Sequence, residues 1–230
     1  MRLDEAKRDH YRKRAREEGY RSRAAFKIKQ MNDKYHFMTR GSSVVDIGCA
    51  PGGWLQMSSQ IVGKNGVIVG VDLDPVKPLS GNVKILQDDV ASKDFAARIT
   101  ESLGNQKADC VLADLSPKLS GIWDMDHYRQ IDLCMKVVDL LPEILKTNGS
   151  NVMKAFQGDQ LDSLIHRLKK SFQRMEISKP EASRKESSEV YLVSIEFIGR
   201  VPSQHLEESQ SQRQSEQPSD SIESDWQDVP

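Results

Sequence analysis

The sequence predicts an α/β fold in which a mostly parallel seven-stranded sheet carries helices on both faces and ends in an antiparallel strand. Short apolar runs alternate with amphipathic segments between residues 43 and 198, and strands that alternate with helices form parallel sheets. Charged residues directly follow most of the apolar runs. The last two runs have no helix between them, so the final strand is expected to run antiparallel.

The individual elements follow from apolar periodicity and from helix start and stop signals. A polar, basic helix is expected over 3–17 and a second helix over 22–31, with Ser22 as its N-cap. A long helix is expected to stop near Asn148-Gly149. The helices expected after the first strand span about 54–62, 92–103, 125–146 and 159–172. The expected strands span 43–47, 67–71, 83–87, 109–113, 150–153, 173–178 and 189–198.

Composition indicates one domain followed by a polar tail. The chain has 230 residues, 29% of them charged, and a formal net charge of −1. We expect residues 1–202 to form the domain and residues 203–230 to be a disordered acidic tail, because the tail almost lacks aliphatic side chains. The tail holds seven acidic residues and one arginine, which leaves about +5 on residues 1–202. A basic domain favours a polyanionic partner, and a solvated charged helix is the alternative.

The sequence disfavours a membrane protein, a secreted protein and a cysteine-ligated metal site. No apolar run approaches the roughly 18 residues of a membrane span, and the N-terminal residues lack the apolar segment of a secretory signal. The three cysteines, Cys49, Cys110 and Cys134, show no metal-ligand spacing. We therefore expect no membrane partner, no metal, a cytoplasmic location and a monomeric chain.

The loop after the first expected strand has the composition of a ligand-binding turn. It reads Asp46-Ile-Gly-Cys-Ala-Pro-Gly-Gly-Trp54, and glycines at a helix start let an anionic group approach the backbone N–H groups. Its G-x-x-x-G-G spacing differs from the G-x-G-x-x-G of dinucleotide folds, which disfavours a nicotinamide oxidoreductase. Taken alone, the loop is equally compatible with a tight structural turn.

Acidic residues at the ends of the next two strands narrow the choice of ligand. Asp72 is placed to accept hydrogen bonds from ribose hydroxyls, and Asp89 is placed to accept one from an adenine amine. A ligand with an amino-acid end, a ribose and an adenine satisfies the loop and both acids. The sequence thus predicts a Rossmann-like class I methyltransferase fold that binds S-adenosylmethionine.

Charged residues also end the fourth and fifth expected strands. Asp114 begins the run Asp-Leu-Ser-Pro, and Lys154 follows the apolar run that ends at Met153. Adjacent parallel strands would bring both residues to the ligand-binding edge, although a structural salt bridge is the alternative. Lys27, before the first strand, and Glu189, at the start of the last strand, are further ionisable candidates. A methyltransferase that acts on amino groups usually carries Asn/Asp-Pro-Pro-Tyr after the fourth strand, so this activity is disfavoured.

Five stretches of the chain together resemble one known family. They are RSRAAFK (21–27), VDIGCAPGGW (45–54), DLSPKLSG (114–121), KAFQG (154–158) and SRKESSEVY (183–191). In this order they resemble the FtsJ/RrmJ family, the ribosomal RNA large subunit methyltransferase E enzymes, over about residues 10–200. The resemblance implies a catalytic tetrad at Lys27, Asp114, Lys154 and Glu189. It also implies S-adenosylmethionine contacts from Gly52, Trp54, Asp72, Asp89 and Asp114.

The resemblance implies methylation of a ribose 2′-hydroxyl on a uridine of 23S-type ribosomal RNA, in the A-loop, with the large ribosomal subunit as partner. A transfer RNA 2′-O-ribose methyltransferase of the same family is the alternative. A non-catalytic RNA-binding relic is a remote alternative, because no member of the tetrad is missing.

The roles of several residues stay open at this level. Lys154 is expected to act as a general base if it is neutral, or to orient the 2′-oxygen if it is charged. The basic N-terminal helix with Arg21 and Arg23, and the loop 179–185, are expected to hold RNA phosphates. Three aromatic residues are candidates for stacking on a base, with core packing as the alternative for each. They are Trp123, Phe156 and Tyr191.

Overall fold

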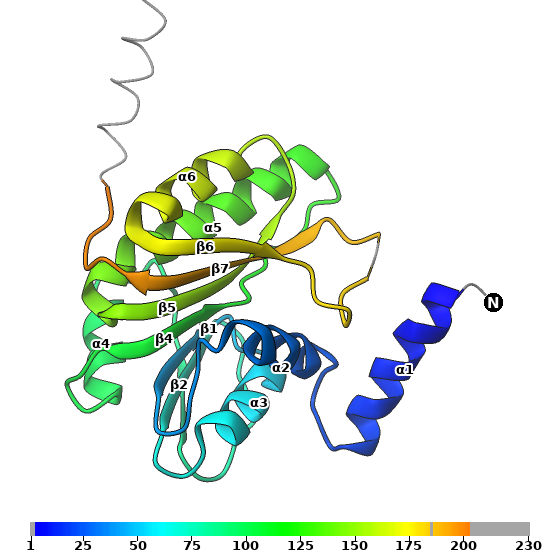
Figure 1. Ribbon diagram of the computed structural model, residues 1–230, viewed down its shortest axis with the longest axis horizontal. Coiled ribbons are helices and arrows are strands. Elements are labelled where there is room, and N and C mark those ends of the chain that lie inside the picture. Colours follow the sequence, from blue (N-terminus) through cyan, green and yellow to red (C-terminus); the bar gives the residue numbers. More distant parts are fainter. Residues whose placement is uncertain (1–2, 185, 203–230) are drawn as a thin grey trace, which may run out of the picture.

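Seven strands form one sheet in the computed structural model, which describes residues 3–184 and 186–202 (Figure 1). The strands are β1 (Ser43–Ile47), β2 (Val67–Asp72), β3 (Val83–Gln87), β4 (Ala108–Ala113), β5 (Leu145–Phe156), β6 (Phe172–Ser178) and β7 (Glu189–Phe197). The helices are α1 (Leu3–Glu17), α2 (Ala24–Tyr35), α3 (Gly53–Val62), α4 (Phe95–Ser102), α5 (Trp123–Ile144) and α6 (Leu161–Ser171).

The strand order is β3-β2-β1-β4-β5-β7-β6. The pairs β3–β2, β2–β1, β1–β4 and β4–β5 are parallel, whereas β7 lies between β5 and β6 and is antiparallel to both. No helix separates β6 from β7, so the chain reverses directly into the sheet. The predicted fold class is therefore confirmed.

Two hydrophobic cores lie on opposite faces of the sheet (Figure 1). One face packs against α4, α5 and α6, and the other packs against α2 and α3. Strand residues alternate between the two faces. In β4, for example, Val111 and Ala113 belong to the first core, and Cys110 and Leu112 belong to the second. The same alternation decides which polar side chains at the strand ends share a face.

Two of the expected boundaries were wrong. The fifth strand begins at Leu145 rather than at residue 150, and the expected helix stop at Asn148-Gly149 lies inside it. Asn148 has a φ of 64°, and the ladder to β4 shifts register nearby, so this dipeptide forms an irregularity within the strand. Helix α2 begins at Ala24 with Arg23 at its cap position and no side-chain cap, so Ser22 is not the N-cap.

A small third core fixes α1 to the rest of the molecule. Ala15 of α1, Phe26 of α2 and Ala182 are buried together, with Tyr11 packed against them. The Arg14 guanidinium carbon lies 4.8 Å from the centroid of the Phe26 ring. These contacts join α1 to α2 and to the loop between β6 and β7.

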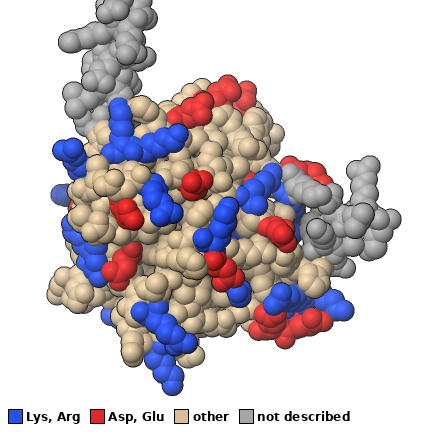
Figure 2. Space-filling model, in the orientation of Figure 1, with Lys and Arg blue, Asp and Glu red and all other residues tan. Residues whose placement is uncertain are grey.

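Charges of both signs lie close together on the face of the molecule seen in Figure 2. Exposed intrahelical pairs such as Lys13–Glu17 in α1 partly neutralise the basic helix. The expected acidic tail, 203–230, lies outside the described residues. Among the described helices, none is long and apolar enough to cross a membrane.

Truncating Phe26 tests how α1 is held. Phe26 is 2% exposed, and loss of a buried phenyl ring costs about 3–5 kcal/mol of unfolding free energy. We expect Phe26→Ala to lower stability in urea and to make α1, with its lysines and arginines, the first site of native-state trypsin cleavage. Phe172→Ala is the matched control, because Phe172 is also buried but packs on Phe197, in the core next to α6. Early cleavage of α1 in both variants, or in neither, would contradict this account.

Candidate active site

Lys154 lies at the end of β5 in a buried network of oxygen acceptors. Its Nζ lies 3.0 Å from Asp114 Oδ1 and donates hydrogen bonds to the Asp114 carbonyl oxygen at 3.2 Å and to Ser116 Oγ at 2.6 Å. Lys154 is 5% exposed. Removing either partner of such a buried ion pair leaves an uncompensated charge. The two residues expected at neighbouring strand ends are therefore in contact, as the strand order requires.

A second lysine–carboxylate pair lies on the same face of the sheet. Lys27 Nζ of α2 lies 3.1 Å from Glu189 Oε2 and donates a hydrogen bond to the Tyr191 hydroxyl at 2.7 Å. Burial acts to raise the pKa of Glu189, but the charges of Lys27 and Lys154 outweigh it and hold that pKa below its usual value. Tyr191 was considered in the sequence only as a stacking or core residue, and its hydroxyl belongs to this polar cluster.

The pairing of β5 with β7 brings the two pairs together. Lys154 lies opposite Tyr191, and Phe156 lies opposite Glu189. Tyr191 belongs to the core beneath α2 and α3, and cross-strand neighbours share a face. The four residues of the expected tetrad therefore meet on the side of the sheet covered by α2, at its carboxyl-terminal edge.

The glycine loop is shaped by close backbone approach. Gly48 has a φ of +80°, and a Cβ there would lie 2.9 Å from the backbone nitrogen of Leu115. Gly52, the cap residue of α3, has a φ of +107°, and a Cβ there would lie 2.6 Å from Nη1 of Arg21. Gly48 therefore requires glycine on two counts, the left-handed backbone and the absence of space, whereas at Gly52 the left-handed backbone favours glycine and a Cβ would displace the end of the Arg21 side chain.

Two side chains hold this loop in place. Asp72 Oδ2 accepts a hydrogen bond from the Ala50 N–H at 2.7 Å. The Arg21 guanidinium donates to the carbonyl oxygens of Pro51, Lys77 and Pro78 at 2.7–3.1 Å. Arg21 was expected to hold RNA phosphates, and the structure instead gives it the role of joining the glycine loop to the loop after β2. Asp72 keeps free lone pairs, since a carboxylate accepts about four hydrogen bonds.

Buried polar atoms without partners mark where a ligand fits. Both carboxylate oxygens of Asp46, which is fully buried, and Nε1 of Trp54 have no hydrogen-bond partner. Burial, and then the charges of Asp114 and Asp72, hold the pKa of Asp46 well above its usual value. Such orphaned groups are rare in folded proteins and need a reason. A cationic ligand with hydrogen-bonding groups would give these buried atoms their missing partners. The residues therefore fit S-adenosylmethionine.

The remaining expected cofactor residue lies at the edge of this region. Asp89, after β3, is exposed, and its Oδ1 accepts a hydrogen bond from the Ala91 N–H at 2.9 Å. Its neighbour Asp88 is bonded to Arg98 and Ser92 instead. The sequence marks Asp46 only as the first residue of the glycine-rich loop and does not assign it to the cofactor. Its burial, which a single sequence does not reveal, is the signal that singles it out.

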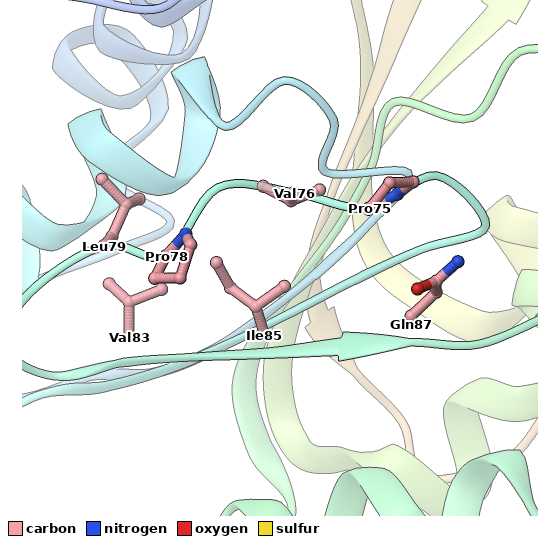
Figure 3. A pocket seen from close by; sticks show the side chains of 7 residues that line it. All are labelled: Pro75, Val76, Pro78, Leu79, Val83, Ile85 and Gln87. Atoms are coloured by element: carbon pink, nitrogen blue, oxygen red, sulfur yellow. The ribbon is translucent and has the colours of Figure 1, made fainter.

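One pocket adjoins this region, since its lining residue Gln87 precedes Asp88 and pairs with Asp72 in the β2–β3 ladder (Figure 3). It has a volume of about 300 Å³ and lies between β3 and the loop that follows β2. Its lining is Pro75, Val76, Pro78, Leu79, Val83, Ile85 and Gln87. Since this lining contains no ionisable group, the pocket offers no acid–base or nucleophilic chemistry. Within the described residues, no group of three or more His, Cys, Asp or Glu side chains is arranged to hold a metal ion.

Comparisons with known proteins agree with this geometry. The family model of FtsJ-like methyltransferases matches residues 20–197. A ribosomal RNA large subunit methyltransferase E of Methanothrix thermoacetophila is 46% identical over 83% of this chain and 73% of its own length. The protein of that name from Cenarchaeum symbiosum is 42% identical over 86% of this chain and all of its own length.

Solved structures show the same architecture. A structure from Plasmodium falciparum, described as a ribosomal RNA methyltransferase, has a TM-score of 0.71 at 30% identity and covers 79% of this chain and 100% of its own. A fibrillarin/Nop5p complex chain has a TM-score of 0.52 at 16% identity, covers 74% of this chain and 81% of its own, and shows the fold alone.

Substitution of Asp46 tests the ligand assignment in two ways. A raised folded pKa means that Asp46 lowers the stability of the fold at every pH above its ordinary pKa of 3.8. We expect Asp46→Asn to raise the melting temperature of the free protein at pH 7, by about 2–4 °C for each kcal/mol relieved. This gain should shrink as the pH falls toward 3.8 and should be absent below it, where Asp46 is protonated in both the folded and the unfolded chain. We also expect affinity for S-adenosylmethionine to fall in calorimetry.

Asp109→Asn is the control of opposite sign. Burial acts to raise the pKa of Asp109, but Lys146 and Ser43 outweigh it and lower that pKa. At pH values above the ordinary pKa of an aspartate, ionised Asp109 therefore stabilises the fold. The control should lose stability at pH 7 and keep cofactor affinity. An Asp46→Asn protein less stable than the wild type at pH 7 would count against the assignment.

Proposed function

Because the chain belongs to the FtsJ-like methyltransferase family, we propose that it methylates the ribose 2′-hydroxyl of a uridine in large-subunit ribosomal RNA. The names of relatives at 41–46% identity support ribosomal RNA as the substrate. One observation carries the choice of a hydroxyl acceptor: buried Lys154 already donates a hydrogen bond to a hydroxyl, that of Ser116, beside the carboxylate of Asp114.

S-Adenosylmethionine is the proposed methyl donor and supplies an electrophilic methyl group on a sulfonium centre when it is bound. Gly52 and the start of α3 would receive its carboxylate end, since helix N-termini present free N–H groups. Asp72 and Asp89 would accept hydrogen bonds from its ribose and adenine. Asp46 and Trp54, whose polar atoms are buried and unpartnered, would gain partners in the complex.

Lys154 is proposed to orient the acceptor. Its ammonium has three oxygen contacts, from the Asp114 carboxylate, the Asp114 carbonyl and the Ser116 hydroxyl. This bonding pattern is that of a donor, so of the two roles left open by the sequence we favour orientation of the 2′-oxygen over removal of its proton. Alignment of reacting groups contributes up to about 7–11 kcal/mol to catalysis, which is enough for this role to be essential.

Lys27 is proposed to act beside Lys154 on the incoming ribose. Its ammonium is fixed by Glu189 and by the Tyr191 hydroxyl, so its position is set before RNA binds. A second fixed cation on this face favours the anionic backbone that flanks the target ribose. Glu189 keeps Lys27 in place and limits the local excess of positive charge.

The target nucleotide is proposed to lie in the A-loop of the large ribosomal subunit. Arg23 and the loop that begins at Lys179 remain proposed contacts to RNA phosphates, together with α1. A transfer RNA ribose is the second candidate, because the tetrad alone does not distinguish two RNA classes.

Replacement of Lys154 tests the catalytic assignment. We expect Lys154→Ala to lower methyl transfer by about a hundredfold or more, while S-adenosylmethionine affinity in calorimetry changes little. Lys146→Ala is the matched control, because Lys146 also forms an ion pair from β5 to an aspartate of β4, at 2.7 Å, but at the opposite end of the strands. The control should retain activity. Transfer by Lys154→Ala within a few-fold of wild type would refute the role.

Substrate mapping tests the RNA class. We expect transfer of labelled methyl from S-adenosylmethionine to large ribosomal subunits or their RNA, with the label on a uridine 2′-oxygen of the A-loop. The label should be recovered in an alkali-resistant dinucleotide, because a 2′-O-methyl group blocks alkaline cleavage at that nucleotide. Label found only on transfer RNA would favour the second candidate, and label on a base would exclude the proposed chemistry.

A further inference from the structure

Exposed apolar side chains gather in the segment that leads away from the tetrad. Of the eight large hydrophobic side chains that are strongly exposed among the described residues, five lie between 119 and 128. They are Leu119, Ile122, Trp123, Met125 and Tyr128. Single exposed hydrophobic residues are common, but a concentration of this kind marks an interaction site.

This segment is held at both ends. Ser116, near its start, accepts the hydrogen bond from Lys154. Asp126, in the first turn of α5, accepts hydrogen bonds from the N–H groups of Ser120 and Gly121 and from the Ser120 hydroxyl, at 2.7–3.1 Å. The hydrogen bonds from Ser120 lower the pKa of Asp126, so this anchor is ionised at neutral pH. The apolar side chains are thus presented on the loop before α5 and on the first turns of that helix, in a segment anchored to Lys154 through Ser116.

Trp123 is the best-placed member of the segment. Its ring is nearly parallel to those of Phe156, at 26° and 5.8 Å between centroids, and His127, at 19° and 6.3 Å. Phe156 and His127 are buried, whereas Trp123 is 48% exposed. Trp123 therefore lies on top of a rigid aromatic base and leaves part of its surface to solvent.

The position of Phe156 places this stack beside the reacting groups. Phe156 follows Lys154 by two residues in β5, so the two side chains emerge on the same face about 7 Å apart along the strand. Phe156 also lies opposite Glu189 in the β5–β7 ladder. An RNA whose ribose reaches Lys154 therefore brings its neighbouring bases to Trp123.

We propose that the exposed surface of Trp123 is a stacking site for an unpaired nucleobase of the RNA, at or next to the methylated nucleotide. The inference rests on the proposed function, since it assumes an RNA acceptor. Unpaired bases stack on aromatic side chains, and the interaction tolerates any base because each has a π-face. A flat ring supported from below and adjacent to the tetrad suits a planar base better than the irregular surface of a protein partner.

Steady-state kinetics of methyl transfer test the site. We expect Trp123→Ala to raise KM for naked ribosomal RNA roughly ten- to a hundredfold, with kcat and S-adenosylmethionine affinity little changed. Trp123→Phe, which keeps a flat ring, should recover most of the loss. Ile177→Ala is the control, because Ile177 is similarly exposed, at 51%, but lies on β6.

A binding experiment isolates the base itself. We expect Trp123→Ala to weaken binding of a short unstructured oligouridine but not binding of an abasic oligomer of the same length and charge. Equal losses for the two oligomers would overturn the proposal, because the site would then not recognise a base.

The outcomes separate this inference from the function on which it rests. Wild-type transfer to a ribose 2′-oxygen with an unchanged KM for Trp123→Ala would overturn the stacking site alone. A raised KM on assembled subunits but not on naked RNA would assign the surface to a ribosomal protein and would also overturn it. No transfer to RNA by the wild-type protein would overturn both.

Discussion

The antiparallel pairing of β5 with β7 brings the two lysine–carboxylate pairs of the site together. In a purely parallel sheet, the strand next to β5 would present its carboxyl-terminal end at the ligand edge. Here β7 runs the other way, so its first residue, Glu189, reaches that edge and lies across from Phe156. Tyr191 then falls opposite Lys154 and extends its hydroxyl to Lys27 of α2. A slip of one residue in this ladder would turn Glu189 and Tyr191 toward the opposite core.

The site combines paired buried charges with one that has no partner. Lys154 and Lys27 are each matched by a carboxylate at 3.0–3.1 Å. Asp46, between strands that carry further acids, has neither a cation nor a hydrogen bond. Paired charges keep the cost of burial moderate, whereas an isolated carboxylate costs stability until a ligand satisfies it. Residues that are required for function often lower the stability of the free protein in this way. Binding of the ligand then stabilises the folded state.

The aromatic stack at the end of β5 extends the same edge of the sheet toward solvent. Phe156 and His127 are buried and fixed, and a Cβ at Gly158 would lie 2.7 Å from the His127 ring. Of the three aromatic residues considered for stacking, Phe156 and Tyr191 pack inside the molecule, and Trp123 alone is half-exposed. Whether an aromatic ring is buried or half-exposed depends on its place in the folded molecule, and the residue type does not determine this.

The strands, their order of appearance and the charged residues that end them can all be predicted from the sequence. These features are local, because apolar runs with period 2 or 3.6 and glycine-rich turns act through neighbouring residues. The sequence also identifies the family, since the motifs keep their identity without regard to packing. Helix and strand ends were less well determined: Asn148-Gly149 resembles a helix stop but lies within a strand, because pairing with β4 overrides the turn preference.

The contacts between residues far apart in the sequence depend on how the strands and helices pack together. Lys27 and Glu189 are 162 residues apart in sequence, and their contact exists because β7 inserts beside β5 beneath α2. The partners of Arg21 are backbone carbonyls of two loops, which carry no side-chain signature in a sequence. The burial of Asp46 arises from the layers packed above and below β1. Contacts and burial are properties of the packed layers. The chemistry of these side chains therefore depends on how the helices pack against the sheet.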